Sequence, residues 1–121
     1  MVKFMIVFRH PEDAEAFENV YQDFLGLVER MPHIQRRQVV HITGSPLGSP
    51  DAYRILELYF ESTNAQQNAL LSEIGQEAGQ ELQRLKRGSY ELYFADVYEE
   101  AGAQTAQPQP ESIAESQSDD S

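Results

Sequence analysis

Apolar and polar positions follow two different periods along the first hundred residues, which predicts both strands and helices. Residues 2–9, VKFMIVFR, are β-branched, aromatic or otherwise apolar with no breaker, as is typical of a strand buried on both faces. Residues 33–43, 52–61 and 89–98 also favour strands. The Gly/Ser/Pro-rich residues 44–51 between the second and third strands predict a loop that projects from one end of a hairpin.

A period of three to four residues replaces this pattern after Pro11. Asp13 is suited to cap a helix that begins at Ala14, and Pro32 marks the end of that helix. One apolar stripe follows the helix: Phe17, Val20, Tyr21, Phe24, Val28 and Met31. The stripe predicts an amphipathic helix that packs against the sheet.

A second helical segment occupies residues 62–88, with Ser62 or Thr63 as its cap. Ser72 followed by Glu73 is a second start signal, so we expect a break near residues 71–73. Cations near the end of the segment complement the helix dipole, and Gly88 is suited to the position after its last turn.

The order β-α-β-β-α-β predicts an α+β fold of the ferredoxin-like kind, with a four-stranded antiparallel sheet. Helices in this arrangement cover one face of the sheet only. The first, third and fourth strands nevertheless carry large apolar side chains on both alternations, whereas a half-solvated sheet alternates apolar with polar residues. We therefore expect a homodimer through the sheet faces, closed as a dimeric α/β barrel.

Charge divides the chain into two parts. Its 121 residues suit one domain with a modest core. From Glu99 onward it carries six of its 20 acidic residues and no Lys or Arg, which leaves 14 acids and 9 bases before that point. This end is poor in bulky apolar residues and cannot offset the entropy cost of ordering. We expect one ferredoxin-fold domain over residues 1–99 and a disordered acidic tail over residues 100–121.

Composition also restricts the classes of partner. A net charge of −11 argues against nucleic acid, because binding phosphates requires clustered cations. The absence of cysteine excludes disulfides and thiolate metal sites. No stretch approaches the roughly 20 apolar residues of a membrane span, and the N-terminus does not have the form of a signal peptide. We expect a cytoplasmic location and no membrane contact.

Five stretches, in this order and at these separations, resemble the EthD-like family of dimeric α/β-barrel proteins over residues 2–99. They are VKFMIVFRHPEDAEAF, LVERMPHI, GSPLGSP, ELYF and SEIGQEAGQEL. Related dimeric barrels include cofactor-independent monooxygenases, a lactone isomerase and haem-dependent enzymes, so the resemblance implies the fold but does not choose a reaction. Many members carry Tyr-x-x-x-His-x-Pro late in the first helix, whereas the stretch after Tyr21 has neither that histidine nor that proline.

Glu57 lies within the apolar run RILELYFE, on the same alternation as Tyr59. On a sheet covered on both sides, a carboxylate must be paired, hydrogen-bonded or protonated. The candidate partners on the neighbouring strand are Arg37, His41 and, in the other register, Arg36. One interpretation is a buried ion pair that fixes strand register or the dimer interface. The other is an acid/base group that faces a pocket.

His41 is the histidine that we expect in the interior, so Glu57 and His41 are the candidate catalytic residues. Tyrosine hydroxyls are suited to orient a ligand in an apolar cavity, and the candidate ligand-binding residues are Tyr21, Tyr53, Tyr59 and Tyr93. No metal-ligand spacing, nucleotide-binding loop or serine-hydrolase motif is present. We expect no metal and no cofactor; haem would need His41 as its axial ligand and rests on fold analogy alone.

Two functional hypotheses follow. The first is an enzyme that binds a hydrophobic or aromatic small molecule and acts in catabolism as a cofactor-independent, monooxygenase-like oxidoreductase or as an isomerase. The second is a non-catalytic binding or accessory protein of a degradation pathway, which the missing first-helix histidine favours.

Overall fold

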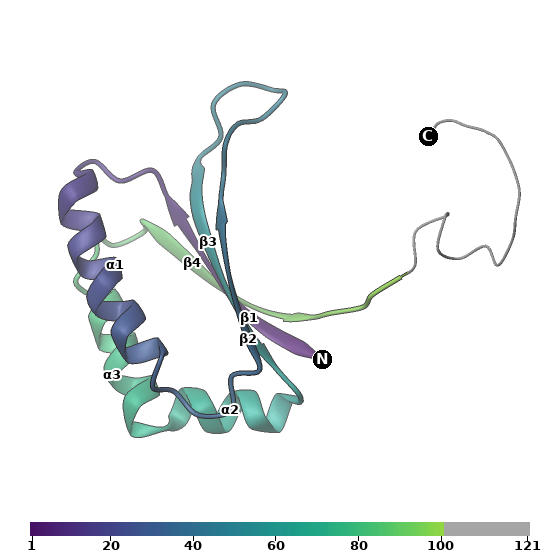
Figure 1. The fold of residues 1–121 in the computed structure, drawn as a ribbon. Coiled ribbons are helices and arrows are strands. Elements are labelled where there is room, and N and C mark those ends of the chain that lie inside the picture. The colour runs from purple at the N-terminus through teal and green to yellow at the C-terminus, as the bar shows by residue number, and fades with distance from the viewer. Residues whose placement is uncertain (101–121) are drawn as a thin grey trace, which may run out of the picture.

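The computed structural model describes residues 1–100 and places four strands and three helices among them (Figure 1). In chain order they are β1 (Val2–Arg9), α1 (Ala14–Val28), β2 (Arg36–His41), β3 (Ala52–Phe60), α2 (Thr63–Leu71), α3 (Glu73–Leu82) and β4 (Tyr90–Asp96). The predicted order of elements is confirmed, with the second helix divided into α2 and α3. The tail predicted for residues 100–121 lies, from residue 101 onward, outside the described residues.

The four strands form one antiparallel sheet in the order β2-β3-β1-β4. The central strand β1 pairs through Ile6 with Leu56 of β3 and with Leu92 of β4. β2 and β3 form a hairpin whose connecting loop projects beyond the sheet, and the three helices gather on one side of it (Figure 1). The predicted ferredoxin-like sheet with one helix-covered face is therefore confirmed.

α1 begins where the sequence predicts. The side chain of Asp13 accepts a hydrogen bond from the backbone N–H of Ala16 at 3.1 Å, which satisfies one of the free donors at the helix start. The predicted apolar stripe is buried along its length: Phe17, Val20, Tyr21, Phe24 and Val28. The helix ends at Val28, before Pro32 is reached, and the stripe's last member, Met31, is buried just beyond it.

Ser72 separates α2 from α3 and caps the second of them. Its backbone is extended, and its hydroxyl accepts a hydrogen bond from the N–H of Gly75 at 3.0 Å. The same hydroxyl donates to the carbonyl of Ala69 in the last turn of α2 at 2.6 Å. One side chain thus closes one helix and opens the next, and the break predicted near residues 71–73 is confirmed.

The end of α3 differs from the prediction. The helix ends at Leu82, so the cations that follow it lie in the connection to β4 and not in the last helical turn. Within this connection the carbonyl of Lys86 accepts from the N–H of Ser89 at 3.1 Å, and Gly88 has φ +83°. Gly88 is therefore the third residue of a β-turn, where a positive φ is required, and its predicted role at the helix end is wrong.

The core lies between the helices and one face of the sheet. Alternate side chains of β1 and β3 point into it: Phe4, Ile6, Phe8, Leu56, Leu58 and Phe60. The ring of Phe8 meets those of Phe17 and Tyr21 edge to face, with centroids 5.3 Å and 5.5 Å apart. Burying each such side chain stabilises the fold by about 1.5–3 kcal/mol, so this layer holds the helices on the sheet.

The opposite face of the sheet is open within residues 1–100. Met5, Val7 and Ile55 are half-buried there, and the side chain of Tyr93 on β4 is 47% exposed. We call this surface the open face. It combines apolar side chains with the charged group described below.

We expect Gly75→Ala to lower the free energy of unfolding by about 1–3 kcal/mol, because a Cβ at this position would collide with the carbonyl oxygens of Ala69 and Leu70. Gly79→Ala, in the same helix with open space around it, should raise that free energy by about 0.5–1 kcal/mol. Urea denaturation of both variants measures the difference. Equal effects of the two substitutions would contradict this account of the break.

Candidate functional site

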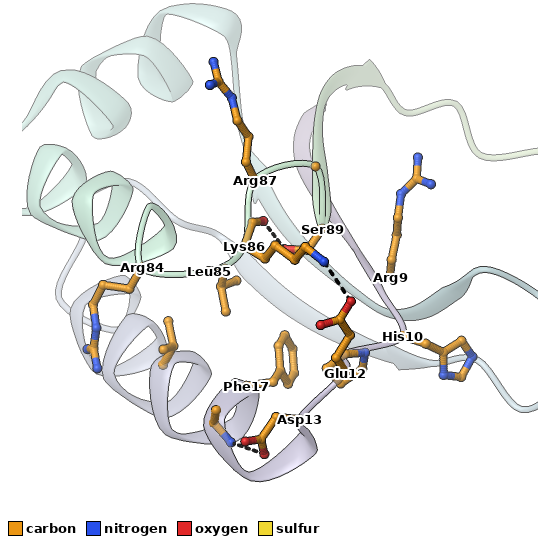
Figure 2. A pocket seen from close by; sticks show the side chains of 14 residues that line it. Arg9, His10, Glu12, Asp13, Phe17, Arg84, Leu85, Lys86, Arg87 and Ser89 are labelled. Atoms are coloured by element: carbon orange, nitrogen blue, oxygen red, sulfur yellow. Dashed lines mark hydrogen bonds and ion pairs between the residues drawn. The ribbon is translucent and has the colours of Figure 1, made fainter.

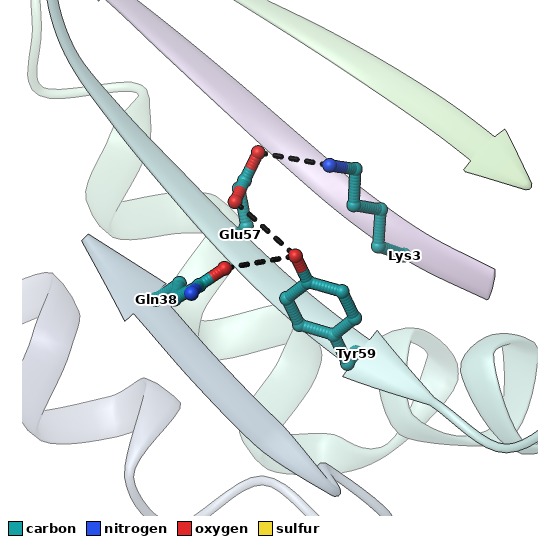
Figure 3. A network of polar contacts seen from close by, with 4 residues as sticks. All are labelled: Lys3, Gln38, Glu57 and Tyr59. Carbon is teal, nitrogen blue, oxygen red and sulfur yellow. Dashed lines mark hydrogen bonds and ion pairs between the residues drawn. The ribbon is translucent and has the colours of Figure 1, made fainter. Parts of the chain in front are cut away.

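Glu57 lies at the centre of the open face and is 9% exposed. Its carboxylate accepts a hydrogen bond from Lys3 Nζ at 2.9 Å, and the hydroxyl of Tyr59 lies 3.4 Å from its other oxygen (Figure 3). The same hydroxyl lies 2.9 Å from Gln38 Oε1, so its single proton is shared between these two acceptors. The four side chains come from β1, β2 and β3 and form a continuous network, so the carboxylate is paired and hydrogen-bonded.

Tyr59 contacts cations as well as the carboxylate. The guanidinium of Arg36 lies 4.2 Å from the centre of its ring, and Lys3 Nζ lies 5.6 Å from the same point. Both distances lie within the range of cation–π attraction. The network therefore contains one carboxylate and two cations, and we call these five residues, Lys3, Arg36, Gln38, Glu57 and Tyr59, the charged network.

The predicted partners of Glu57 on the neighbouring strand of the hairpin, Arg36, Arg37 and His41, are wrong. Glu57 lies opposite Gln38, and its cation comes from β1, on the other side of β3. Arg37 instead pairs with Glu29 at 3.5 Å. His41 lies opposite Arg54. It is three positions from Gln38 along β2, so its side chain points to the other face of the sheet from Gln38 and Glu57, and it is exposed. Glu57 and His41 do not meet, and their catalytic roles stay predictions.

The four predicted tyrosines divide between the two faces of the sheet. Tyr59 and Tyr93 lie on the open face, whereas Tyr21 is buried on the helix-covered side. Tyr53 also turns toward the helices, and its ring packs edge to face on Phe17 at 5.7 Å. The pairing of β1 with β3 shifts between Phe8 and Arg9, which leaves Tyr53 of β3 with no opposite residue, and such an irregularity redirects a side chain. The tyrosines therefore do not form one ligand-binding group.

Arg54 is a buried cation that the sequence analysis did not single out. Its guanidinium donates to both carboxylate oxygens of Glu18, at 3.1 Å and 2.8 Å, and lies 4.6 Å from the ring centre of Tyr21. Burial raises the pKa of Tyr21, so this phenol is neutral at physiological pH. The Arg54 side chain thereby fixes α1 on β3. The sequence signal was that Arg54 falls on the same alternation of its strand as Leu56 and Leu58, which predicts that its side chain faces the core.

A cavity of about 380 Å³ opens where β1 ends (Figure 2). Its walls come from the β1–α1 junction, from one side of α1 and from the connection between α3 and β4. The apolar part of the wall consists of Pro11, Ala16, Phe17, Val20 and Leu85. Residues distant in sequence therefore enclose a space of the size that binds small molecules.

Charged and polar groups form the remainder of this wall. Lys86 Nζ and a carboxylate oxygen of Glu12 lie 2.7 Å apart and link the two sides of the cavity (Figure 2). The ammonium group beside Glu12 holds the pKa of that carboxyl below its usual value, so the pair is charged at neutral pH. His10 and Ser89 also line the cavity.

The six predicted site residues all lie outside the wall of this cavity. Sequence reasoning missed the cavity because it assigned residues 84–87 to the last turn of a helix. The run RLKRGS, which follows the end of α3 and contains three cations and a glycine, was the sequence signal for a loop at this place.

Among residues 1–100, no three His, Asp or Glu side chains are placed to hold a metal ion together. The helices of the same range are too short or too polar to cross a membrane.

Comparison with known proteins identifies relatives of the whole described domain. No family model matches the chain. An uncharacterized 11.0 kDa protein in the thcB-thcC intergenic region of Rhodococcus erythropolis is 30% identical over 97 residues, which cover 79% of this chain and 94% of that protein. A crystal structure of an ethyl tert-butyl ether D (EthD) family protein from Bacillus halodurans has a TM-score of 0.76 at 25% identity, over 81% of this chain and 99% of that one.

Two further solved structures share the fold at lower identity. SnoaB, a cofactor-independent oxygenase from Streptomyces nogalater, has a TM-score of 0.62 at 16% identity and covers 82% of this chain and 94% of its own. A dimeric ferredoxin-like protein of unknown function from a Jannaschia species has a TM-score of 0.61 at 16% identity, over 80% of this chain and all of its own.

Removing one member of the Lys3–Glu57 pair should destabilise the protein more than removing both. Lys3→Met and Glu57→Leu should each lower the free energy of unfolding by about 1–3 kcal/mol, because each leaves a covered polar partner unpaired. The double variant should recover most of that loss. Urea denaturation at one fixed protein concentration measures all three.

Arg9→Met is the control, because the Arg9–Glu91 pair on the neighbouring strands is solvent-exposed and should contribute less than about 1 kcal/mol. If the double variant loses as much free energy of unfolding as the two single variants together, the coupling between Lys3 and Glu57 is contradicted.

Proposed function

The chain belongs to the EthD-like family, and on this premise we propose that it is a homodimer that binds an apolar or aromatic small molecule and oxidises it without a cofactor. The observation that carries the proposal is the cavity of about 380 Å³, whose wall combines five apolar side chains with charged and polar groups. In small-molecule sites apolar surface holds the body of the ligand and polar groups fix its orientation. The proposed reaction class is that of a monooxygenase.

The open face supports the homodimer. Two copies that face each other would cover the half-buried Met5, Val7 and Ile55 and the exposed ring of Tyr93. Glu57 would enter that interface already paired with Lys3, so dimerisation would bury no unpaired charge. The Jannaschia protein with this fold is described as dimeric.

The likeness to SnoaB, described as a cofactor-independent oxygenase, supports the reaction class. Without a cofactor the substrate itself must supply the electrons that reduce O₂. Conversion of an acidic methylene to a carbonyl satisfies this balance, because one oxygen atom enters the product and the other leaves as water with the two hydrogens. Such a reaction starts with removal of a proton by a base.

His10 is the best placed proton acceptor in this proposal. Of the three histidines it alone lines the cavity, at the end of β1, whereas His41 lies exposed on β2. Glu57 would lie between the two sheets of the dimer, which favours its structural interpretation. The catalytic roles predicted for Glu57 and His41 are therefore tested beside that of His10.

A second candidate is binding without turnover, as an accessory protein of a degradation pathway. One observation favours it: the side chains predicted to carry the chemistry lie outside the cavity. An isomerase would use the same cavity without consuming O₂.

We expect the purified full chain, treated with a chelator, to consume one O₂ for each 2-tetralone oxidised; this aromatic ketone has an acidic methylene and serves as a probe. His10→Ala should lower kcat at least about 100-fold, the usual contribution of a general base, and leave binding of the probe intact. An oxygen electrode and product analysis measure both.

The matched controls are His41→Ala and Glu57→Gln, which should retain activity. Binding of the probe with no O₂ consumption would favour the accessory protein, and turnover without O₂ would favour the isomerase. Either result would contradict the oxygenase.

A further inference from the structure

We propose that the cavity beside α1 is a site for an organic anion, namely an aromatic or alicyclic carboxylate whose carboxylate group binds Lys86 in place of Glu12. The inference rests on the proposed function and specifies its ligand class. It is carried by the position and exposure of the Lys86–Glu12 pair and by the apolar wall beside that pair.

Cations outnumber carboxylates among the side chains that line the cavity. The protein has 20 acidic residues and 9 Lys or Arg, for a net charge of −11. Four of those cations line the cavity, namely Arg9, Arg84, Lys86 and Arg87, against two carboxylates. Arg9 and Arg84 already pair with carboxylates outside the wall, namely Glu91, Asp23 and Glu81. The cations left to attract a ligand are therefore Lys86 and Arg87, and their charge favours an anionic ligand.

The two carboxylates of the cavity differ in how firmly they are held. Asp13 caps α1 through its hydrogen bond with the N–H of Ala16. Glu12 contacts Lys86 alone among the described cations, and the two side chains are 80% and 70% exposed. An exposed ion pair of this kind contributes about 0.2–1 kcal/mol, so a ligand carboxylate can replace Glu12 at small cost.

The turn that carries Lys86 fixes the backbone of this residue at the rim of the cavity. The carbonyl of Lys86 accepts hydrogen bonds from both the backbone N–H and the hydroxyl of Ser89, at 3.1 Å and 2.5 Å. The positive φ of Gly88 completes the turn. In Figure 2 the Lys86 side chain extends toward Glu12, whereas Arg84 and Arg87 point away from it. Lys86 is therefore the cation in position to contact a ligand.

An apolar surface lies beside this cation. Phe17 and Leu85 face each other on opposite sides of the cavity, one from α1 and one from the connection before β4 (Figure 2). A neutral apolar ligand would desolvate Lys86 without replacing its hydration, which is unfavourable. A ligand with an apolar body and one carboxylate would fill the apolar part and pair with the ammonium group.

Three fluorescent probes that share a naphthalene ring test the proposal: 1-naphthoate, 1-naphthalenemethanol and 1-naphthylmethylammonium, which are an anion, a neutral molecule and a cation at pH 7.5. We expect the full chain to bind the anion about fivefold or more tightly than the neutral probe, and the cation most weakly. Titration of the protein with each probe gives the three dissociation constants.

Two substitutions should act in opposite directions. Lys86→Gln should remove most of the preference for 1-naphthoate and leave the neutral probe unaffected. Glu12→Gln should tighten 1-naphthoate about two- to fivefold, because Lys86 is then free of its competitor. Both side chains are exposed, and urea denaturation confirms that the variants fold. Arg30→Gln makes the same change of charge outside the cavity and is the matched control.

Each result has one interpretation. Equal binding of the anionic and neutral probes, unaffected by Lys86→Gln, would overturn the anion site and leave the proposed small-molecule function standing. An equal loss with Arg30→Gln and Lys86→Gln would also overturn it, because the effect would then be one of total charge. Binding of none of the three probes would overturn the site and the proposed function together.

Discussion

A four-stranded sheet has two faces, and residues 1–100 supply helices for one of them. The central strands β1 and β3 carry apolar side chains on both alternations. The face that the helices leave uncovered therefore also presents apolar side chains. This constraint explains the charged network. A carboxylate among apolar neighbours is stable there because Lys3 and Tyr59 replace the water that it loses. The same network offers a partner surface a fixed pattern of polar contacts, which would favour one register of association over others.

The fold separates the proposed dimer interface from the proposed ligand site. The open face is built from the middles of the strands, whereas the cavity is built where β1 ends and where the chain re-enters the sheet after α3. Apart from Arg9 at the end of β1, the cavity is lined by loops and the first turns of α1, so most of its chemistry can vary without changes in the sheet. Phe17 belongs both to the cavity and to the core, since it forms part of the cavity wall and its ring also packs on Phe8.

Local signals were sufficient to predict most of the fold. The cap at Asp13, the apolar stripe of α1 and the break at Ser72 each depend on residues within one or two turns of each other. The site could not be predicted in the same way. The partner of Glu57 depends on the strand order, which places β1 beside β3 although 54 residues separate Lys3 from Glu57. The cavity depends on where α3 ends, and the cations after Leu82 favour a longer helix as much as they favour a loop.

Sedimentation equilibrium of the full chain at micromolar concentration tests the central constraint most directly. The account predicts a folded species of twice the 13.8 kDa chain mass. Met5→Glu would place an unpaired charge in the middle of the open face and should dissociate this species into folded single chains. Val39→Glu, on the other face of β2, should leave the dimer intact. A wild-type protein that stays folded as a single 13.8 kDa chain at these concentrations would contradict the account.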